Sequence, residues 1–219
     1  MLRLAAAVFA LALTGCDAAD LAGPDAAPLR SAPTGDQALW FGPGGSQVDG
    51  TLKPVAGPDA RLQVDLRLDA PGTHVVLASS ESLRLAVELD GSVAVALPAW
   101  TDGAPDVWTL ASPAGAVAPG AWTRLEVIYD EVRLTLRVDG QTVAETTAHA
   151  DQSLRAPGPV ALAPTLVGAV ASLAFTSADG QTVVQAATFD EGWGTSTQVS
   201  GLSGGTWALK APRWVPVRR

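Results

Sequence analysis

The chain has 219 residues, of which 47% are hydrophobic, and this is enough apolar material for one sizeable domain with a buried core. Lys and Arg number 14 against 22 Asp and Glu, and the resulting net charge of −8 argues against binding to the phosphate backbone of nucleic acid. The single cysteine excludes an internal disulfide, and two histidines leave little material for histidine-based metal or acid–base sites.

The first sixteen residues, MLRLAAAVFALALTGC, have the features of an export signal. Arg3 supplies a positive charge, and residues 4–13 form an apolar run that is too short to span a bilayer. The Leu-Thr-Gly-Cys sequence that ends at Cys16 resembles the lipobox of bacterial lipoproteins, in which the cysteine is lipidated before cleavage. This resemblance implies that residues 1–15 are a signal peptide and that a lipid on Cys16 holds the protein at a membrane.

Residues 16–36 are rich in Ala, Asp, Pro and Gly and have no apolar period, so we interpret them as a flexible tether. The alternative, a core helix with a buried cysteine, is disfavoured because such a helix would not precede a linker. Asp17 resembles an inner-membrane retention signal of enteric bacteria, but that rule does not hold across all bacteria. The expected location is therefore the bacterial cell envelope, at either the inner or the outer membrane.

From residue 37 onward the hydrophobic pattern has a period of two, which is typical of half-buried β-strands. In residues 61–68, apolar side chains predicted to be buried alternate with polar ones predicted to face water. The apolar set is Leu62, Val64, Leu66 and Leu68, and the polar set is Arg61, Gln63, Asp65 and Arg67.

Three reversals of the chain can be predicted from turn chemistry. Residues 83–87 and 93–97 bring their apolar side chains to one face only if Gly91 is left-handed in a three-residue loop, which pairs Val87 with Val93 and Leu85 with Val95. Residues 125–129 are expected to face 132–136 across a tight 130–131 turn. A two-residue turn at 139–140 then pairs Leu136 with Val143. We find no convincing helical period after residue 36, and this favours a sandwich or jelly roll.

Two segments resemble laminin G-like domains. PGAWTRLEVIYD at 119–130, followed by LTLRVDGQ at 134–141, is similar to the central motif of that family, and GAVASLAF at 168–175 is similar to its late strand. The resemblance implies an all-β, concanavalin A-like antiparallel jelly roll, which we assign to residues 37–219. It also raises calcium as a cofactor, because domains of this family commonly bind one ion at a sheet rim.

The order of the strands differs from the family pattern at the C-terminus. FDEGWGT at 189–195, with Ser200, Gly201 and Trp207 downstream, resembles the opening strand of such a domain. A permuted strand order and a truncated second repeat are the two alternatives. We favour permutation, with 189–217 as the displaced opening strand, because about thirty residues cannot bury a core alone. The basic segment 210–219 is expected to pair with an acidic face or to form an edge strand.

The candidate binding residues are Trp100, Trp108, Asp102 and Asp106. The two tryptophans flank 101–107, TDGAPDV, which we predict to be a polar, turn-rich loop. Aromatic rings beside carboxylates can bind sugars, and the same two aspartates can supply oxygen ligands to calcium. The alternatives are tryptophans that cover a sheet edge and aspartates that only form turns. We assign four further tryptophans to the core or to sheet cover: Trp40, Trp193, Trp207 and Trp214.

These features predict a module that binds a glycan or an envelope protein. A structural envelope protein without a specific ligand is the alternative. A glycoside hydrolase ranks last, because such enzymes need paired carboxylates on one strand face. The nearest spacing is Glu88 and Asp90, and Asp90 is predicted to lie in a turn, so no catalytic residue is assigned.

Overall fold

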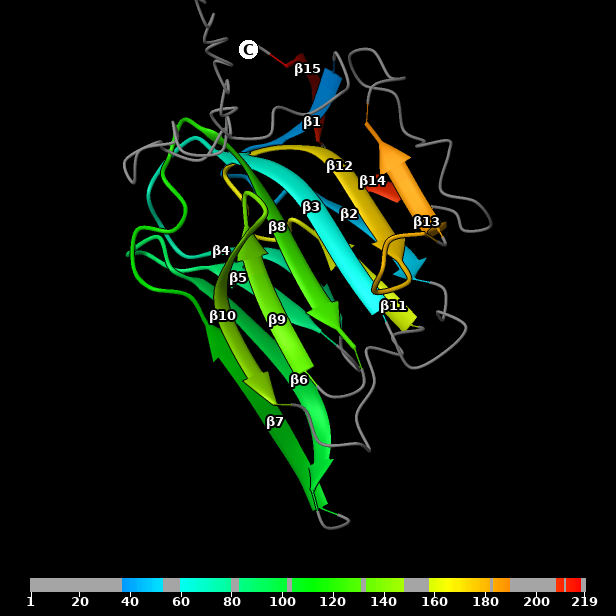
Figure 1. The fold of residues 1–219 in the computed structure, drawn as a ribbon. Coiled ribbons are helices and arrows are strands. Elements are labelled where there is room, and N and C mark those ends of the chain that lie inside the picture. The colour runs from blue at the N-terminus through cyan, green and yellow to red at the C-terminus, as the bar shows by residue number, and fades with distance from the viewer. Residues whose placement is uncertain are drawn as a thin grey trace, which may run out of the picture.

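The computed structural model describes residues 37–52, 60–79, 83–101, 104–130, 133–147, 158–181, 183–189, 208–210 and 212–217. Over these ranges the chain forms fifteen strands and no helix, so it holds no helix long and apolar enough to cross a membrane. The strands make two antiparallel sheets that pack face to face (Figure 1). This confirms the predicted all-β sandwich.

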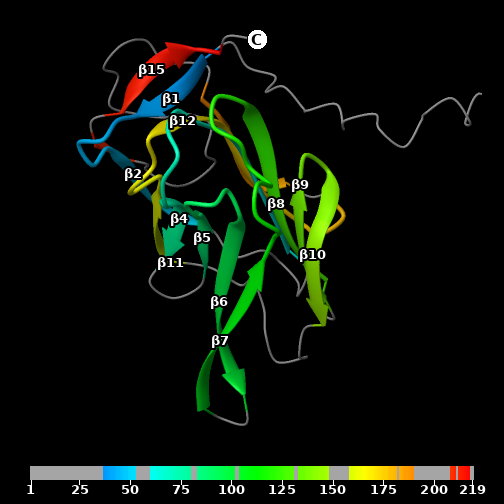
Figure 2. The same ribbon diagram turned by 90° about the vertical axis from the view of Figure 1, so that its left-hand side faces the viewer.

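The larger sheet has eight strands. In spatial order they are β10 (Gln141–Thr147), β9 (Arg133–Val138), β8 (Trp122–Tyr129), β3 (Ala60–Leu68), β12 (Gly168–Thr176), β1 (Gln37–Phe41) and β15 (Arg213–Pro216), with β13 (Val183–Thr188) also paired to β12. The second sheet has seven strands, in the order β14 (Ala208–Lys210), β2 (Gln47–Leu52), β11 (Gly158–Leu162), β4 (His74–Ser79), β5 (Arg84–Val87), β6 (Val93–Thr101) and β7 (Ala104–Ala111). The β6–β7 hairpin reaches past the ends of the other strands in both ribbon views (Figures 1 and 2).

The alternating pattern of β3 places its apolar side chains in the core between the sheets, as predicted. Its outer face departs from the prediction at one position. Asp65 was expected to face water, yet it is only 3% exposed. The reason is that Arg124 from β8 and Ser172 from β12 hydrogen-bond to its carboxylate from the two neighbouring strands.

The first predicted hairpin is confirmed in detail. Leu85 pairs with Val95 and Val87 with Val93. Gly91 is left-handed, with φ of 76°, and its amide donates to the carbonyl of Glu88 at 2.9 Å. The turn therefore has the conformation that the one-sided apolar pattern demands.

The second hairpin has the predicted faces but a different register. Tyr129 lies opposite Leu134 and Val127 opposite Leu136, because the Asp130 amide donates to the carbonyl of Arg133 and the turn lies one residue later than predicted. The resulting shift is two residues, an even number, so Leu134 and Leu136 keep their side chains in the core.

The following turn is a two-residue turn, as predicted, with positive φ at both Asp139 (51°) and Gly140 (81°). Beyond it, a β-bulge between Thr142 and Ala144 makes Leu136 pair with Ala144 instead of the predicted Val143.

The two C-terminal strands, β14 and β15, are each an edge strand of one sheet. β15 pairs with β1 along Gln37–Pro216 to Trp40–Arg213, so the first and last described strands lie side by side (Figure 2). β14 pairs with β2, and Lys210 forms an ion pair with Asp49. Of the segment 189–217, residues 190–207 lie outside the described ranges, and its interpretation as a displaced opening strand stays a prediction.

Candidate functional site

The predicted binding loop at 101–107 is mostly strand. β6 extends to Thr101 and β7 starts at Ala104, with Trp100 opposite Pro105 and Leu97 opposite Trp108. The prediction of a loop over the whole of 101–107 was wrong, because residues 104–107, Pro105 included, pair with β6 as part of β7. β7 is the edge strand of its sheet, and at an edge the missing N–H of proline is tolerated.

Of the four predicted binding residues, only the side chain of Trp108 is described. It is partly buried and packs against the main core. Asp102 and the side chains of Trp100 and Asp106 lie outside the described set, so sugar binding or calcium binding by these residues stays a prediction. Among the residues that the structure does describe, no group of three or more His, Cys, Asp or Glu side chains could hold a metal ion.

A different arrangement of polar and aromatic side chains lies on the outer face of the eight-stranded sheet. The strand register places five residues in one row across β8, β3, β12, β1 and β15. In order they are Trp122, Arg67, Ala169, Trp40 and Arg213. Residues directly opposite one another in neighbouring strands share a face, so the row alternates aromatic and cationic side chains around one small residue.

A small apolar cluster forms the base of this row. Ala38, Ala169 and Ala171 are buried there beneath Trp40, Trp122, Val215 and Val217, separately from the main core. A hollow of about 580 Å³ opens beside these residues. Its lining consists of Trp40, Arg67, Arg213, Val215 and Pro216, and we call it the outer-face groove.

The indole of Trp40 is held in place from two sides. Its Nε1 donates to Oδ2 of Asp69 at 2.8 Å, and Oδ1 of the same carboxylate accepts from Nε of Arg67 at 3.0 Å. On the other side, a Cβ at Gly42 would lie 2.7 Å from the ring, so the indole occupies space that only glycine leaves open. The ring is therefore fixed before any ligand arrives.

The two arginines of the groove differ in their surroundings. The guanidinium of Arg67 stacks over the ring of Trp122, 5.5 Å from its centroid, and its bond to Asp69 uses one of its five N–H donors. Arg213 is exposed and forms no ion pair with any carboxylate of the described ranges. Within the part of the chain that the structure describes, Arg213 is therefore the groove cation whose charge no carboxylate offsets.

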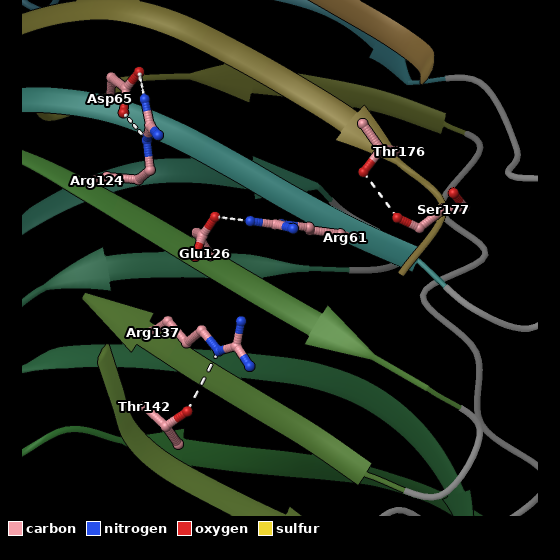
Figure 3. Close-up of polar contacts among 8 residues, drawn as sticks. All are labelled: Arg61, Asp65, Arg124, Glu126, Arg137, Thr142, Thr176 and Ser177. Atoms are coloured by element: carbon pink, nitrogen blue, oxygen red, sulfur yellow. Dashed lines mark hydrogen bonds and ion pairs between the residues drawn. The ribbon is translucent and has the colours of Figure 1, made fainter. Parts of the chain in front are cut away.

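Farther along the same face, β3 and β8 carry two ion pairs whose carboxylates are buried (Figure 3). Asp65 accepts from Nε and Nη2 of Arg124 at 2.7 and 3.0 Å and from the Ser172 hydroxyl at 2.7 Å. The hydrogen bond to Asp65 raises the pKa of Arg124 above its usual range. Glu126, 2% exposed, is paired with Arg61. Because partners occupy these carboxylates, we assign both pairs to the stability of the sheet.

The carboxylates of the 88–92 turn are also engaged. Glu88 accepts from the Thr73 hydroxyl at 3.1 Å. Asp90 accepts from the hydroxyl and the amide of Ser92, and these bonds lower the pKa of Asp90. A smaller hollow of about 240 Å³ lies beside this turn, but none of its described lining residues is aromatic or cationic. The outer-face groove is therefore the better candidate for a binding site.

Sequence reasoning missed the groove. It assigned Trp40 to core or sheet cover, and it placed Arg67 on a wet strand face without a role. Its residues come from β1, β3 and β15, which are distant in sequence and meet only through the order of strands in the sheet. The only local signal was the basic C-terminal segment that contains Arg213.

Comparison with known proteins gives a fold and no family assignment. No family model matches the chain, and no curated protein matches it. Among solved structures, a candidate carbohydrate-binding protein from Bacteroides ovatus superimposes with a TM-score of 0.60 at 9% identity, over 84% of this chain and 62% of that one.

Two further structures are similar at lower TM-scores. Domains LG4-5 of the mouse laminin alpha1 chain give 0.49 at 19% identity, over 68% of this chain and 44% of that one. The CBM40 domain of the Ruminococcus gnavus IT-sialidase, bound to alpha2,3 sialyllactose, gives 0.45 at 15% identity, over 61% and 87%. The chain thus spans less than two thirds of the Bacteroides and laminin chains that it matches. Taken with the two antiparallel sheets, the similarity to the Bacteroides structure shows that this chain has a jelly-roll sandwich fold.

Proposed function

We propose that the protein is a lipid-anchored binding protein of the bacterial cell envelope and that it binds a glycan in the outer-face groove. The observation that carries this proposal is the fixed indole of Trp40, which lines a hollow together with two arginines. The name of the Bacteroides ovatus neighbour agrees with this class of ligand, although that similarity establishes only the fold.

The chemistry of the groove suits a sugar. An indole ring presents a flat apolar face, and sugar rings carry C–H groups that pack on such a face, while guanidinium N–H groups donate to hydroxyl oxygens. Ligand sites generally combine an apolar wall with a few fixed polar groups. Here Val215 and Pro216 extend the apolar wall, and Arg67 and Arg213 supply the polar groups.

The anchoring part of the proposal rests on the sequence alone, because residues 1–36 lie outside the described ranges. Cys16 would carry the lipid and residues 16–36 would hold the domain away from the membrane.

Binding to a glycan array, followed by calorimetry on any hit, tests the proposal. We expect Trp40→Ala to weaken binding at least tenfold, because a ring fixed in advance loses little entropy on binding. Trp108→Ala is the matched control, since it removes a tryptophan of the other sheet, and it should leave affinity unchanged.

Two results would overturn the proposed site. Loss of binding in Trp108→Ala or Trp100→Ala, with Trp40→Ala unaffected, would move the site to the β6–β7 hairpin. The absence of any glycan ligand would favour the alternative of a structural envelope protein.

A further inference from the structure

We propose that the outer-face groove selects sugars that carry a single carboxylate, and that Arg213 is the residue that recognises this charge. The inference rests on the proposed function, because it names the class of glycan that the same groove would take. It goes beyond that function in assigning different roles to the two arginines.

The positions of the arginines support recognition of a ligand that lies across the row. Arg67 and Arg213 are separated by the positions of Ala169 and Trp40, that is, by three strand spacings or about 14 Å between Cα atoms. Both nevertheless line one hollow, so their side chains approach it from opposite ends. A sugar ring seated on Trp40 would have one guanidinium at each end.

The partners of the arginines decide which of them takes the carboxylate. Asp69 neutralises much of the charge of Arg67 and fixes its orientation, so Arg67 is suited to hold Trp40 and to donate to a neutral hydroxyl. Arg213 has no carboxylate partner in the described ranges, and its planar guanidinium can bind a carboxylate with two parallel hydrogen bonds.

The net charge of the protein limits the ligand further. The net charge of −8 disfavours a densely charged polyanion, because such a chain would extend beyond the groove over a surface that is negative on balance. A single carboxylate is different, because at physiological ionic strength charges beyond about 8 Å are largely screened and the nearby guanidinium dominates. The groove is therefore suited to a sugar acid, and a highly sulfated chain is disfavoured.

Calorimetry with matched ligands tests the inference. The ligands are oligosaccharides of galacturonic, glucuronic and sialic acid, each compared with its carboxyl-reduced form. We expect the wild-type protein to prefer at least one acid over its reduced form. Arg213→Gln should weaken binding of that acid about 10- to 100-fold, the usual worth of a hydrogen bond between charged groups, and leave binding of the reduced form unchanged.

Arg137→Gln is the matched control. Arg137 lies on β9 of the same sheet, bonded to Thr142 and outside the groove, so its removal changes net charge equally without touching the site. Arg213→Lys should restore part of the affinity because it keeps the charge without the planar fork. Unchanged circular dichroism and melting temperature in Arg213→Gln would show that β15 remains paired.

The outcomes separate the inference from the function on which it rests. A neutral glycan bound in a Trp40-dependent way, with no preference for the acid, would overturn the inference and leave glycan binding intact. Equal weakening by Arg213→Gln and Arg137→Gln would also overturn it, because the effect would then follow net charge. Failure of every glycan to bind would overturn both.

Discussion

Replacing Asp65 with alanine is the most direct test of the outer face of the eight-stranded sheet. The carboxylate accepts two hydrogen bonds from Arg124 and one from Ser172, and it is 3% exposed. Breaking a buried ion pair by removing one partner typically costs about 3–5 kcal/mol. The Arg124 side chain is 25% exposed, so water can rehydrate part of it, and we expect a loss near the lower end, about 3 kcal/mol.

Equilibrium unfolding in urea at pH 7 measures this loss. With a slope of about 2 kcal/mol per molar urea, the midpoint should fall by about 1.5 M. Glu145→Ala is the matched control, because the Arg133–Glu145 pair is about half exposed on both sides and should contribute less than about 1 kcal/mol. If Asp65→Ala shifted the midpoint no more than Glu145→Ala does, the ion pair on the outer face would not be stabilising and the reasoning would be refuted.

Three further predictions concern other parts of the molecule. Gly168→Ala would place a methyl 2.1 Å from the carbonyl oxygen of Arg67, and we expect a loss of about 1–3 kcal/mol in thermal unfolding. Ser92→Ala should raise the pKa of Asp90 toward its usual value in an NMR titration, because the bonds from the serine favour the ionised carboxylate. In the wild type, the stability that these bonds contribute is present above the unfolded-state pKa of Asp90 and is lost as the pH falls through its folded-state pKa. Cys16→Ser should allow the protein to be extracted from membranes without detergent.

Each of these predictions has a result that would contradict it. The first fails if Gly168→Ala melts like Gly44→Ala, whose added Cβ would meet no atom within 4 Å. The second fails if the titration of Asp90 is the same with and without the serine. A Cys16→Ser protein that still needs detergent would show that the lipid is not its anchor.

The fold was predictable because alternation and turn chemistry are local signals. The left-handed Gly91 and the pairing of Val87 with Val93 follow from one requirement, that apolar side chains share a face. The same requirement cannot detect an even shift, which is why Tyr129 was predicted opposite Val132 and lies opposite Leu134. The β-bulge between Thr142 and Ala144 could not be predicted from the sequence either, since no particular residue type marks it.

The candidate site was less predictable because it depends on strand order. Trp40 and Arg213 are far apart in sequence, and they become neighbours only because β15 pairs with β1. Asp65 shows the same limit for burial. Its place in the alternation predicts an exposed side chain, but partners from two neighbouring strands cover it. The alternation of apolar and polar residues predicts which face of the sheet a side chain lies on. Its neighbours on that face depend on which strands pair, and these can be distant in sequence.

The pairing of β1 between β12 and β15 has a mechanical consequence. A force applied through the segment before Gln37 enters the domain along β1, whose hydrogen bonds run across the strand to a partner on each side. A pull directed along β1 would load these bonds together in shear and would not peel them apart one at a time. β15 thus clamps the strand at which a membrane tether would pull, and it also forms one wall of the outer-face groove.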